Sequence, residues 1–242
     1  MEFFDVVKKR RSIRKFKSDP LPKGALEQIL DSARFAMSGA NGQPWEFVVV
    51  TNQKTKDKMV DIYIEFSRKR ICAIEQTRDL KYRHNMFRKF YSDPPGWKNA
   101  PAIIAVCGDL RTYQATVLAT HFFNGEGGPQ GCYLKNVGNA TQLLCLAAAA
   151  LGLGTQWVSV NLGWERKIKE LLHIPDDLII HTLIPVGYAA YKPVAPYRRE
   201  LKEIVHYEKY DQSKYRTDQD VVDFLALLRK KTKTAYGKVV SE

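Results

Sequence analysis

The sequence predicts one domain in which helices and strands alternate, and two observations support this. A chain of 242 residues, 45% of them apolar, is long enough to bury one sizeable core. Short β-branched runs alternate along it with longer segments of helical periodicity. Such alternation is typical of βαβ units, so the pattern alone favours a sheet of parallel strands.

Helical periodicity appears first near the N-terminus and again over residues 22–37. A short apolar face formed by residues 3–7 predicts an N-terminal helix. Between Pro22 and Met37, apolar residues recur at three- and four-residue steps, with Gly39 just beyond the end. Proline at the start and glycine past the end are typical helix boundaries, so an amphipathic helix is expected there.

Four β-branched runs predict buried strands. They cover residues 46–51, 102–107, 155–160 and 182–186. A charged, helical stretch is expected over residues 54–89, and a second helix over about 134–151. Small or apolar side chains cover every face of residues 145–151, which predicts a helix buried all round. It belongs either in the core or at the centre of a subunit interface.

Two remaining segments differ from the rest in composition. The stretch from Asp109 to Gly131 contains four glycines and little periodicity, so a loop near the site is expected. After Val205 the chain becomes polar and tyrosine-rich, and Thr217 is expected to cap a helix with one apolar face. Residues 206–242 would then be an extension to a domain of residues 1–205, packing on the body or on a partner subunit.

The formal net charge of +12 favours encounters with anions. A nucleic-acid-binding protein is therefore a distant alternative, but the basic residues are spread along the whole chain without a binding signature. Four cysteines form no C-x-x-C pair and five histidines form no ligand cluster, so no metal site is expected. Neither a signal peptide nor a spanning segment is recognisable, which predicts a cytoplasmic protein without membrane association.

Two polar motifs in the first fifth of the chain contain candidate ligand-binding residues. Arg10-Arg11-Ser12-Ile13-Arg14 places three guanidiniums within five residues, and the planar donor fork of arginine fits a phosphate. Ser38-Gly39-Ala40-Asn41-Gly42-Gln43-Pro44-Trp45 joins a helix to a strand, and its glycines let the backbone approach a flat ligand. Each motif alone fits an exposed basic run or an ordinary connection equally well.

Two later motifs follow the same chain order. Leu151-Gly152-Leu153-Gly154-Thr155 ends the apolar helix and leads into a strand. Gly187-Tyr188 then opens a proline-punctuated loop that leads to Arg198-Arg199-Glu200-Leu201-Lys202-Glu203. A helix-to-strand connection and an exposed arginine pair explain these two motifs just as well when each is taken alone.

Taken together and in this order, the four motifs resemble the nitroreductase-like FMN-dependent oxidoreductase family over about residues 1–205. The resemblance implies an α+β fold with a central, mostly antiparallel sheet flanked by helices. It also implies a homodimer with FMN at the subunit interface. The family thus contradicts the parallel sheet that the alternation of elements favours.

The resemblance further implies which residues bind the cofactor. The FMN phosphate and ribityl chain would be held by Arg10, Arg11, Ser12 and Arg14, with Ile13 between them. The ring would be lined from the other subunit by Ser38, Gly39, Asn41 and Gln43. The backbone of Val158, Ser159 and Val160 would face the ring near N5. Arg198 would complete the phosphate site, or Arg199 if the register slips by one.

The implied reaction is a ping-pong hydride transfer from NAD(P)H through FMN to a nitroaromatic or quinone-like acceptor. The cofactor carries this chemistry, so no catalytic side chain is expected, and Arg14 would stabilise the reduced ring near N1. Ser159, Val160 and residues 61–97 depart from the bacterial nitroaromatic enzymes. The alternative is a specialised flavoprotein, either a flavin-fragmenting enzyme or a reductive dehalogenase resembling iodotyrosine deiodinase, with lid residues at Glu65, Lys81 and Tyr82.

Overall fold

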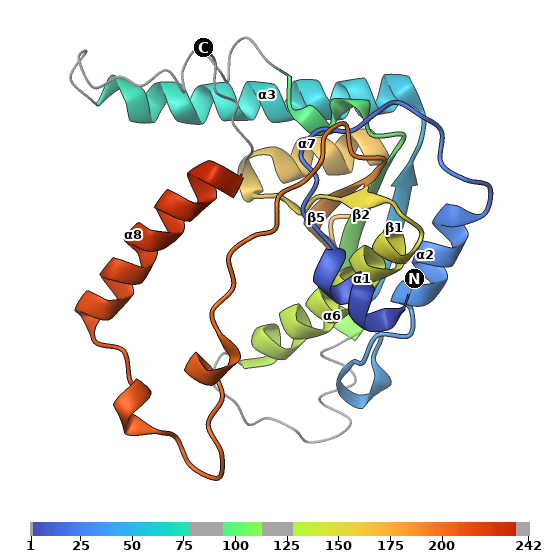
Figure 1. Ribbon diagram of the computed structural model, residues 1–242. Coiled ribbons are helices and arrows are strands. Elements are labelled where there is room, and N and C mark those ends of the chain that lie inside the picture. Colours follow the sequence, from blue (N-terminus) through green and yellow to red (C-terminus); the bar gives the residue numbers. More distant parts are fainter. Residues whose placement is uncertain (1, 78–93, 113–127, 236–242) are drawn as a thin grey trace. The chain divides into compact units, whose positions relative to one another are not determined.

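The computed structural model describes residues 2–77, 94–112 and 128–235 (Figure 1). The chain divides into two compact units, residues 1–190 and residues 191–242. The first contains the whole sheet, and the second contains one long helix and two short 3₁₀ turns.

The sheet is antiparallel throughout its five described strands. These are β1 (Trp45–Val50), β2 (Ala102–Asp109), β3 (Gly154–Thr155), β4 (Val158–Ser159) and β5 (Leu178–Gly187). Their order is β1-β2-β5-β3, with β4 also paired to β5. The mostly antiparallel sheet is confirmed, and the parallel one is wrong. A helix between two strands does not fix their relative direction, and the chain leaving α3 (Gln53–Gln76) re-enters at the end of the sheet where β1 stopped.

The expected strands are found with shifted boundaries. The run over residues 102–107 matches β2, whose side chains are fully buried because neighbouring strands flank it and helices cover it. The strand expected over residues 155–160 is two short pieces, because Gln156 and Trp157 separate β3 from β4. The last strand is longer than expected and begins at Leu178.

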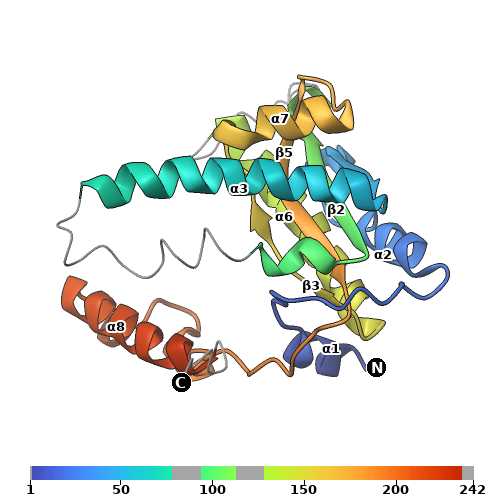
Figure 2. The same cartoon turned by 90° about the horizontal axis from the view of Figure 1, so that it is seen from above.

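Five described helices of the first unit lie around this sheet. They are α1 (Phe3–Lys9), α2 (Ala25–Ala33), α3, α6 (Gly128–Ala150) and α7 (Leu162–Leu172). One face is covered by α2 and α6, whose buried residues share a core cluster with Ile104, Val106 and Ile184. The opposite face is covered by α3 and α7, which pack on each other (Figures 1 and 2).

Several helix predictions need correction. The helix expected over residues 22–37 is shorter, since α2 begins after Gly24 and ends at Ala33. The loop expected over residues 109–131 is regular at both ends, where β2 reaches Asp109 and α6 begins at Gly128. Its middle, and the part of the 54–89 helix beyond residue 77, lie outside the described residues. The helix α7 was not predicted, although Asn161 caps it by accepting the Gly163 N–H at 3.3 Å.

The end of α6 sets where the chain enters the sheet edge. Gly152 adopts a φ of 76°, the left-handed conformation that glycine tolerates best. Its N–H donates to Ala149 O at 3.0 Å, and the Leu153 N–H donates to Ala148 O at 2.9 Å. These two bonds form a Schellman motif, so the predicted helix end is confirmed. Within one chain α6 is not buried all round, because Leu134 is 53% exposed.

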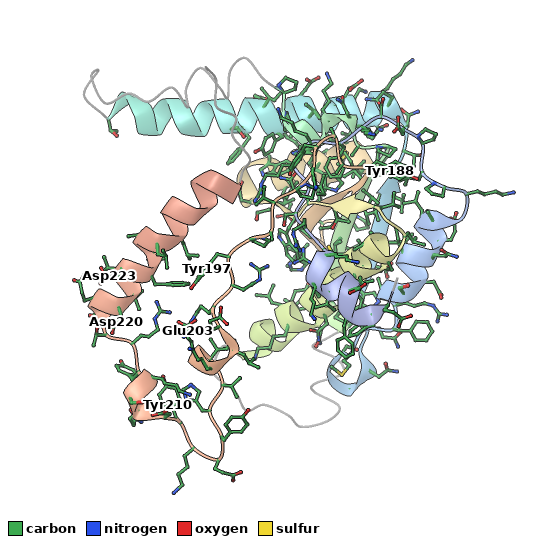
Figure 3. The ribbon with its side chains drawn as sticks, in the orientation of Figure 1. Tyr188, Tyr197, Glu203, Tyr210, Asp220 and Asp223 are labelled. Atoms are coloured by element: carbon green, nitrogen blue, oxygen red, sulfur yellow. The ribbon has the colours of Figure 1, made fainter. Side chains whose placement is uncertain are left out.

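The C-terminal unit contains η4 (Leu201–Glu203), η5 (Gln212–Lys214) and α8 (Asp218–Ala235). Thr217 caps α8 as predicted: its Oγ1 accepts the Asp220 N–H at 3.2 Å, and its own N–H donates to the Asp220 carboxylate at 2.8 Å. Phe224 of α8 lies 6.4 Å from the ring of Tyr197, which reaches toward α8 (Figure 3). The other apolar side chains of α8 are largely exposed, including Val221, Val222, Leu225 and Leu227.

A buried tyrosine–histidine pair links α6 to β5. The Tyr133 hydroxyl lies 2.6 Å from His181 Nε2. Gly108 of β2 makes room for it, because a Cβ there would lie 2.1 Å from the Tyr133 hydroxyl oxygen. Burial raises the pKa of Tyr133 and lowers the pKa of His181. The phenol therefore stays protonated beside a neutral imidazole, and the histidine tautomer sets which of the two donates.

The His181 pair predicts acid-sensitive stability. Because the folded-state pKa of His181 lies below its ordinary value of 6.5, the unfolded chain takes up the proton first as pH falls. The free energy of unfolding should therefore decrease as pH drops below about 6.5. Urea denaturation between pH 8 and pH 5 measures this slope. His181→Gln should flatten it, whereas the exposed His173→Asn should not, and equal slopes in all three proteins would contradict the assignment.

Candidate functional site

The arginine-rich segment of residues 10–14 follows α1 and lies along the edge of the sheet. Its backbone is anchored there, because the Ile13 N–H donates to Thr155 O at 2.8 Å. A second anchor follows four residues later, where the Lys17 N–H donates to Tyr188 O at 2.9 Å. The segment is thus held as an added, extended strand beside β3.

Two glycines permit this close approach. A Cβ on Gly154 would lie 2.3 Å from Ile13 Cγ1, and a Cβ on Gly96 would lie 2.0 Å from the Arg14 carbonyl oxygen. Neither position can carry a side chain without displacing the segment. Successive side chains of an extended segment point to opposite sides. Ile13 accordingly faces the core at 3% exposure, while Ser12 and Arg14 are exposed.

The first two arginines of the segment carry positive charge that no described acidic residue pairs with. Among the described residues, no carboxylate forms an ion pair with Arg10 or Arg11, whereas Lys9 pairs with Asp5 at 3.0 Å. Arg10 acts electrostatically on Cys145 of α6, although burial dominates and raises the pKa of that thiol. Two half-buried guanidiniums without a counter-ion among the described residues make this segment suitable for an anion.

The backbone of residues 158–160, which the resemblance places near the flavin ring, lies on the same sheet edge. β4 continues the line of β3 along β5, with Val158 opposite Leu183 and Ser159 opposite Thr182. Thr182 fixes this edge, because its Oγ1 donates to Val158 O at 3.0 Å. Val158 is buried, Ser159 is exposed and Val160 is half-buried. The structure therefore brings residues 12–14 and 154–160 together on one edge.

The loop of residues 38–43 has an unusual backbone. Ala40, Asn41 and Gln43 have φ values of 49°, 53° and 43°, a region that favours glycine. The loop is braced internally, because the Gln43 N–H donates to Ser38 Oγ at 3.0 Å and Gln43 Nε2 donates to Asn41 O at 3.3 Å. Gly39 and Gly42 do not occupy the left-handed positions of the loop, so the backbone strain falls on residues that carry side chains.

Within one chain, this loop and the arginine segment interact with different parts of α6. The Gly39 N–H donates to Asn136 Oδ1 at 3.3 Å, whereas Arg10 is close to Cys145. Nine residues separate these two positions, which is about 13 Å along a helix. The structure therefore relates the two sets of predicted residues to positions more than two helical turns apart on α6.

Arg198 and Arg199 belong to the C-terminal unit, and their role stays a prediction. Arg198 is exposed, and its Nη1 donates to Tyr197 O at 2.9 Å. Arg199 is partly buried and bonds to Glu203 O at 2.7 Å within its own turn. Arg198 is therefore the freer of the two for a phosphate.

Two buried polar atoms near the site were not recognised from the sequence. In the part of the chain that the structure describes, Asn136 Nδ2 and Gln156 Oε1 have no hydrogen-bond partner. Gln156 directly follows Thr155, and Asn136 lies beneath the loop. Gln156 interrupts the otherwise apolar run that ends in Trp157 and Val158, which is a signal that could have identified it, whereas Asn136 follows Lys135 in a polar stretch that gives none.

Other predicted features bear less directly on the site. Glu65 forms an ion pair with Lys167 at 2.7 Å, whereas Lys81 and Tyr82 lie outside the described residues. Cys107 and Cys145 are buried free thiols. No three metal-ligating side chains converge within residues 2–77, 94–112 and 128–235. No helix in these same ranges is long and apolar enough to cross a membrane.

The close contact at Gly154 predicts the effect of a single methyl group. Gly154→Ala should destabilise the protein by about 1–3 kcal/mol, because the new Cβ overlaps Ile13 and the segment must move. Gly138→Ala is the matched control, since a Cβ at that α6 position meets no atom within 4 Å. Urea denaturation compares the two variants. Equal stability of both would show that Ile13 is not held against Gly154.

Comparison with known proteins agrees with this arrangement. The Nitroreductase family model matches residues 7–188. A putative NADH dehydrogenase/NAD(P)H nitroreductase of Methanothermobacter thermautotrophicus is 27% identical over 216 residues, covering 87% of this chain and 88% of the relative. Iodotyrosine deiodinase 1 of Rattus norvegicus is 26% identical over 216 residues, covering 84% of this chain and 68% of the relative.

The solved structures show the same fold. Oxidised iodotyrosine deiodinase bound to FMN and 3-iodo-L-tyrosine has a TM-score of 0.62 at 24% identity, covering 86% of this chain and 100% of that one. The matched region contains the arginine segment, the loop of residues 38–43 and the β3–β4 edge. The chain belongs to the nitroreductase family.

Proposed function

We propose that this protein is an FMN-dependent oxidoreductase that uses NAD(P)H to reduce a small nitroaromatic or quinone-like acceptor. The observation that carries the proposal is the arginine segment: Ile13 is pinned to Thr155, while Arg10 and Arg11 present charge without an acidic partner among the described residues. The similar proteins, which include a putative NAD(P)H nitroreductase and an FMN-bound deiodinase, support the same proposal.

The residues present fit FMN by their chemistry. The planar donor fork of arginine matches a phosphate, and Arg10 and Arg11 supply two such forks at one edge of the sheet. The exposed Ser12 between them and Ile13 adds a hydroxyl. Gln156 Oε1 is a buried acceptor without a partner in the described chain, next to Thr155 on that edge. A polar ring ligand would give such an acceptor a donor, and an unsatisfied buried acceptor costs about 1–3 kcal/mol.

Bound FMN would supply the hydride chemistry, and the protein would bind and orient it. Arg10 and Arg11 hold the phosphate in this proposal, and Arg198 is the further arginine that the family resemblance assigns to it. Arg14 is our candidate for stabilising negative charge on the reduced ring. The backbone of residues 158–160 borders the ring. No side-chain acid or base is required.

We further propose that the protein is a homodimer. In one chain the loop of residues 38–43 bonds to Asn136, about 13 Å along α6 from Cys145, the residue on which Arg10 acts electrostatically, so a partner's loop would complete each site. Exposed apolar side chains offer a surface for that partner. They include Phe3, Phe4 and Val7 on α1, Phe35 and Met37 after α2, and Leu134 on α6. The C-terminal extension, with its exposed α8 residues, would pack on the body or on the partner subunit.

A reductive dehalogenase is the second candidate, because the rat deiodinase aligns with 84% of the chain. The two candidates differ in their substrates. A broad reductase should consume NADPH with nitrofurazone as acceptor. A dehalogenase should turn over poorly in that assay and bind a halophenol tightly instead.

The direct test is anaerobic mixing of the FMN-loaded protein with NADH or NADPH. We expect loss of flavin absorbance at about 450 nm, followed by reoxidation when nitrofurazone or a quinone is added. Reduction by dithionite but by neither nicotinamide would contradict NAD(P)H as the donor. Tight halophenol binding in the same preparation would then favour the dehalogenase.

The phosphate assignment predicts the effect of one arginine. Arg10→Gln should weaken FMN binding by about 1.5–3 kcal/mol, because a charge-assisted hydrogen bond is lost. Flavin fluorescence titration measures the dissociation constant. Arg34→Gln is the control, since Arg34 is an exposed arginine that pairs with Asp31 on α2. If both variants retained the same affinity as the natural protein, Arg10 would not contact the phosphate.

A further inference from the structure

We infer that Asn136 and Asn139 of α6 are positioning residues that hold the loop of residues 38–43 in its binding conformation. Asn139 Nδ2 donates to Met37 O at 3.1 Å, and Asn136 Oδ1 accepts the Gly39 N–H at 3.3 Å. Residues three apart lie on the same face of a helix. The two amides therefore grip the chain on either side of Ser38, which we call the asparagine clamp.

The loop needs such a clamp because its backbone is strained. Left-handed φ values at Ala40, Asn41 and Gln43 cost of the order of 1–3 kcal/mol each unless the surroundings enforce them. The internal bond from the Gln43 N–H to Ser38 Oγ closes the loop on itself. That bond does not fix the loop to the rest of the protein, whereas the clamp ties it to a helix of the core.

Asn136 does not maximise the stability of the folded protein. Its side chain is 6% exposed, and its Nδ2 finds no hydrogen-bond partner among the described residues. An apolar side chain of similar size would remove that unsatisfied donor, and the gain of about 1–3 kcal/mol would offset the loss of the bond to Gly39. What an apolar residue cannot do is accept the Gly39 N–H. The role of Asn136 is therefore the geometry of the loop.

This inference rests on the proposed function, in which the loop lines the FMN ring. Held by the clamp, the backbone groups of residues 39–43 keep one orientation before the ligand arrives. Preorganisation of this kind raises affinity by removing the cost of ordering the loop on binding. Loss of the clamp should then weaken FMN binding without weakening the core.

The test compares three variants of the full-length protein. Asn136→Leu removes the acceptor for Gly39, and Asn139→Ala removes the second grip at an exposed position. Thr141→Val is the matched control, because Thr141 is a fully buried polar residue of α6 whose Oγ1 bonds only to Val137 O, at 2.8 Å, within the helix. Each variant is measured by FMN titration, by amide hydrogen exchange without FMN, and by urea denaturation.

The clamp predicts a pattern that a structural role would not give. Asn136→Leu should raise the FMN dissociation constant at least tenfold and speed exchange at the Gly39 amide at least tenfold, with the unfolding midpoint unchanged or higher. Asn139→Ala should change both loop readouts in the same direction, so the inference stays testable if Asn136→Leu fails to fold. Thr141→Val should leave both loop readouts as they are.

Unchanged exchange and affinity in both asparagine variants would overturn the inference. So would a loss of affinity that only follows a loss of stability, as Thr141→Val would then show too. If the natural protein bound no FMN, the proposed function would fail, while hydrogen exchange at residues 39–43 would still decide whether the clamp holds the loop.

Discussion

The hydrogen bond from the Ile13 N–H to Thr155 O is the contact on which the candidate site depends. It turns a stretch of charged chain into an extra strand at the sheet edge, and Gly154 and Gly96 leave the space that this strand needs. With Ile13 facing the core, the flanking polar side chains must face outward. The charge of the segment is therefore displayed in a fixed place by an apolar anchor.

The position of that anchor is set by α6. The Schellman motif at Gly152 ends the helix and turns the chain into β3, so Thr155 lies where Ile13 can reach it. The same helix carries Asn136 under the loop of residues 38–43. One core helix thus determines the positions of both groups of candidate residues, and its exposed Leu134 leaves an apolar surface for a partner subunit in our proposal.

Features of the fold and the site that depend on neighbouring residues could be predicted from the sequence, whereas features that depend on distant contacts could not. The run at residues 102–107 identified β2 well, because a strand buried on both faces is apolar at every position. Strand direction could not be predicted from alternation, since it depends on where the chain re-enters the sheet. The left-handed residues Ala40 and Gln43 gave no signal, because the bonds that brace the loop and tie its start to α6 appear only in the folded chain. The arginine motif was recognised by resemblance, whereas its anchor at Gly154 and the amides of Asn136 and Gln156 appear only in three dimensions.

The central claim is that the charged edge beside β3 holds FMN, and equilibrium binding tests it most directly. Purified protein should be stripped of small molecules and dialysed against FMN, and the bound flavin counted against protein. The account predicts saturable binding of about one FMN per chain, as expected for a flavoprotein whose site is repeated in each subunit. Absence of bound flavin at saturating FMN, with the protein folded, would contradict it.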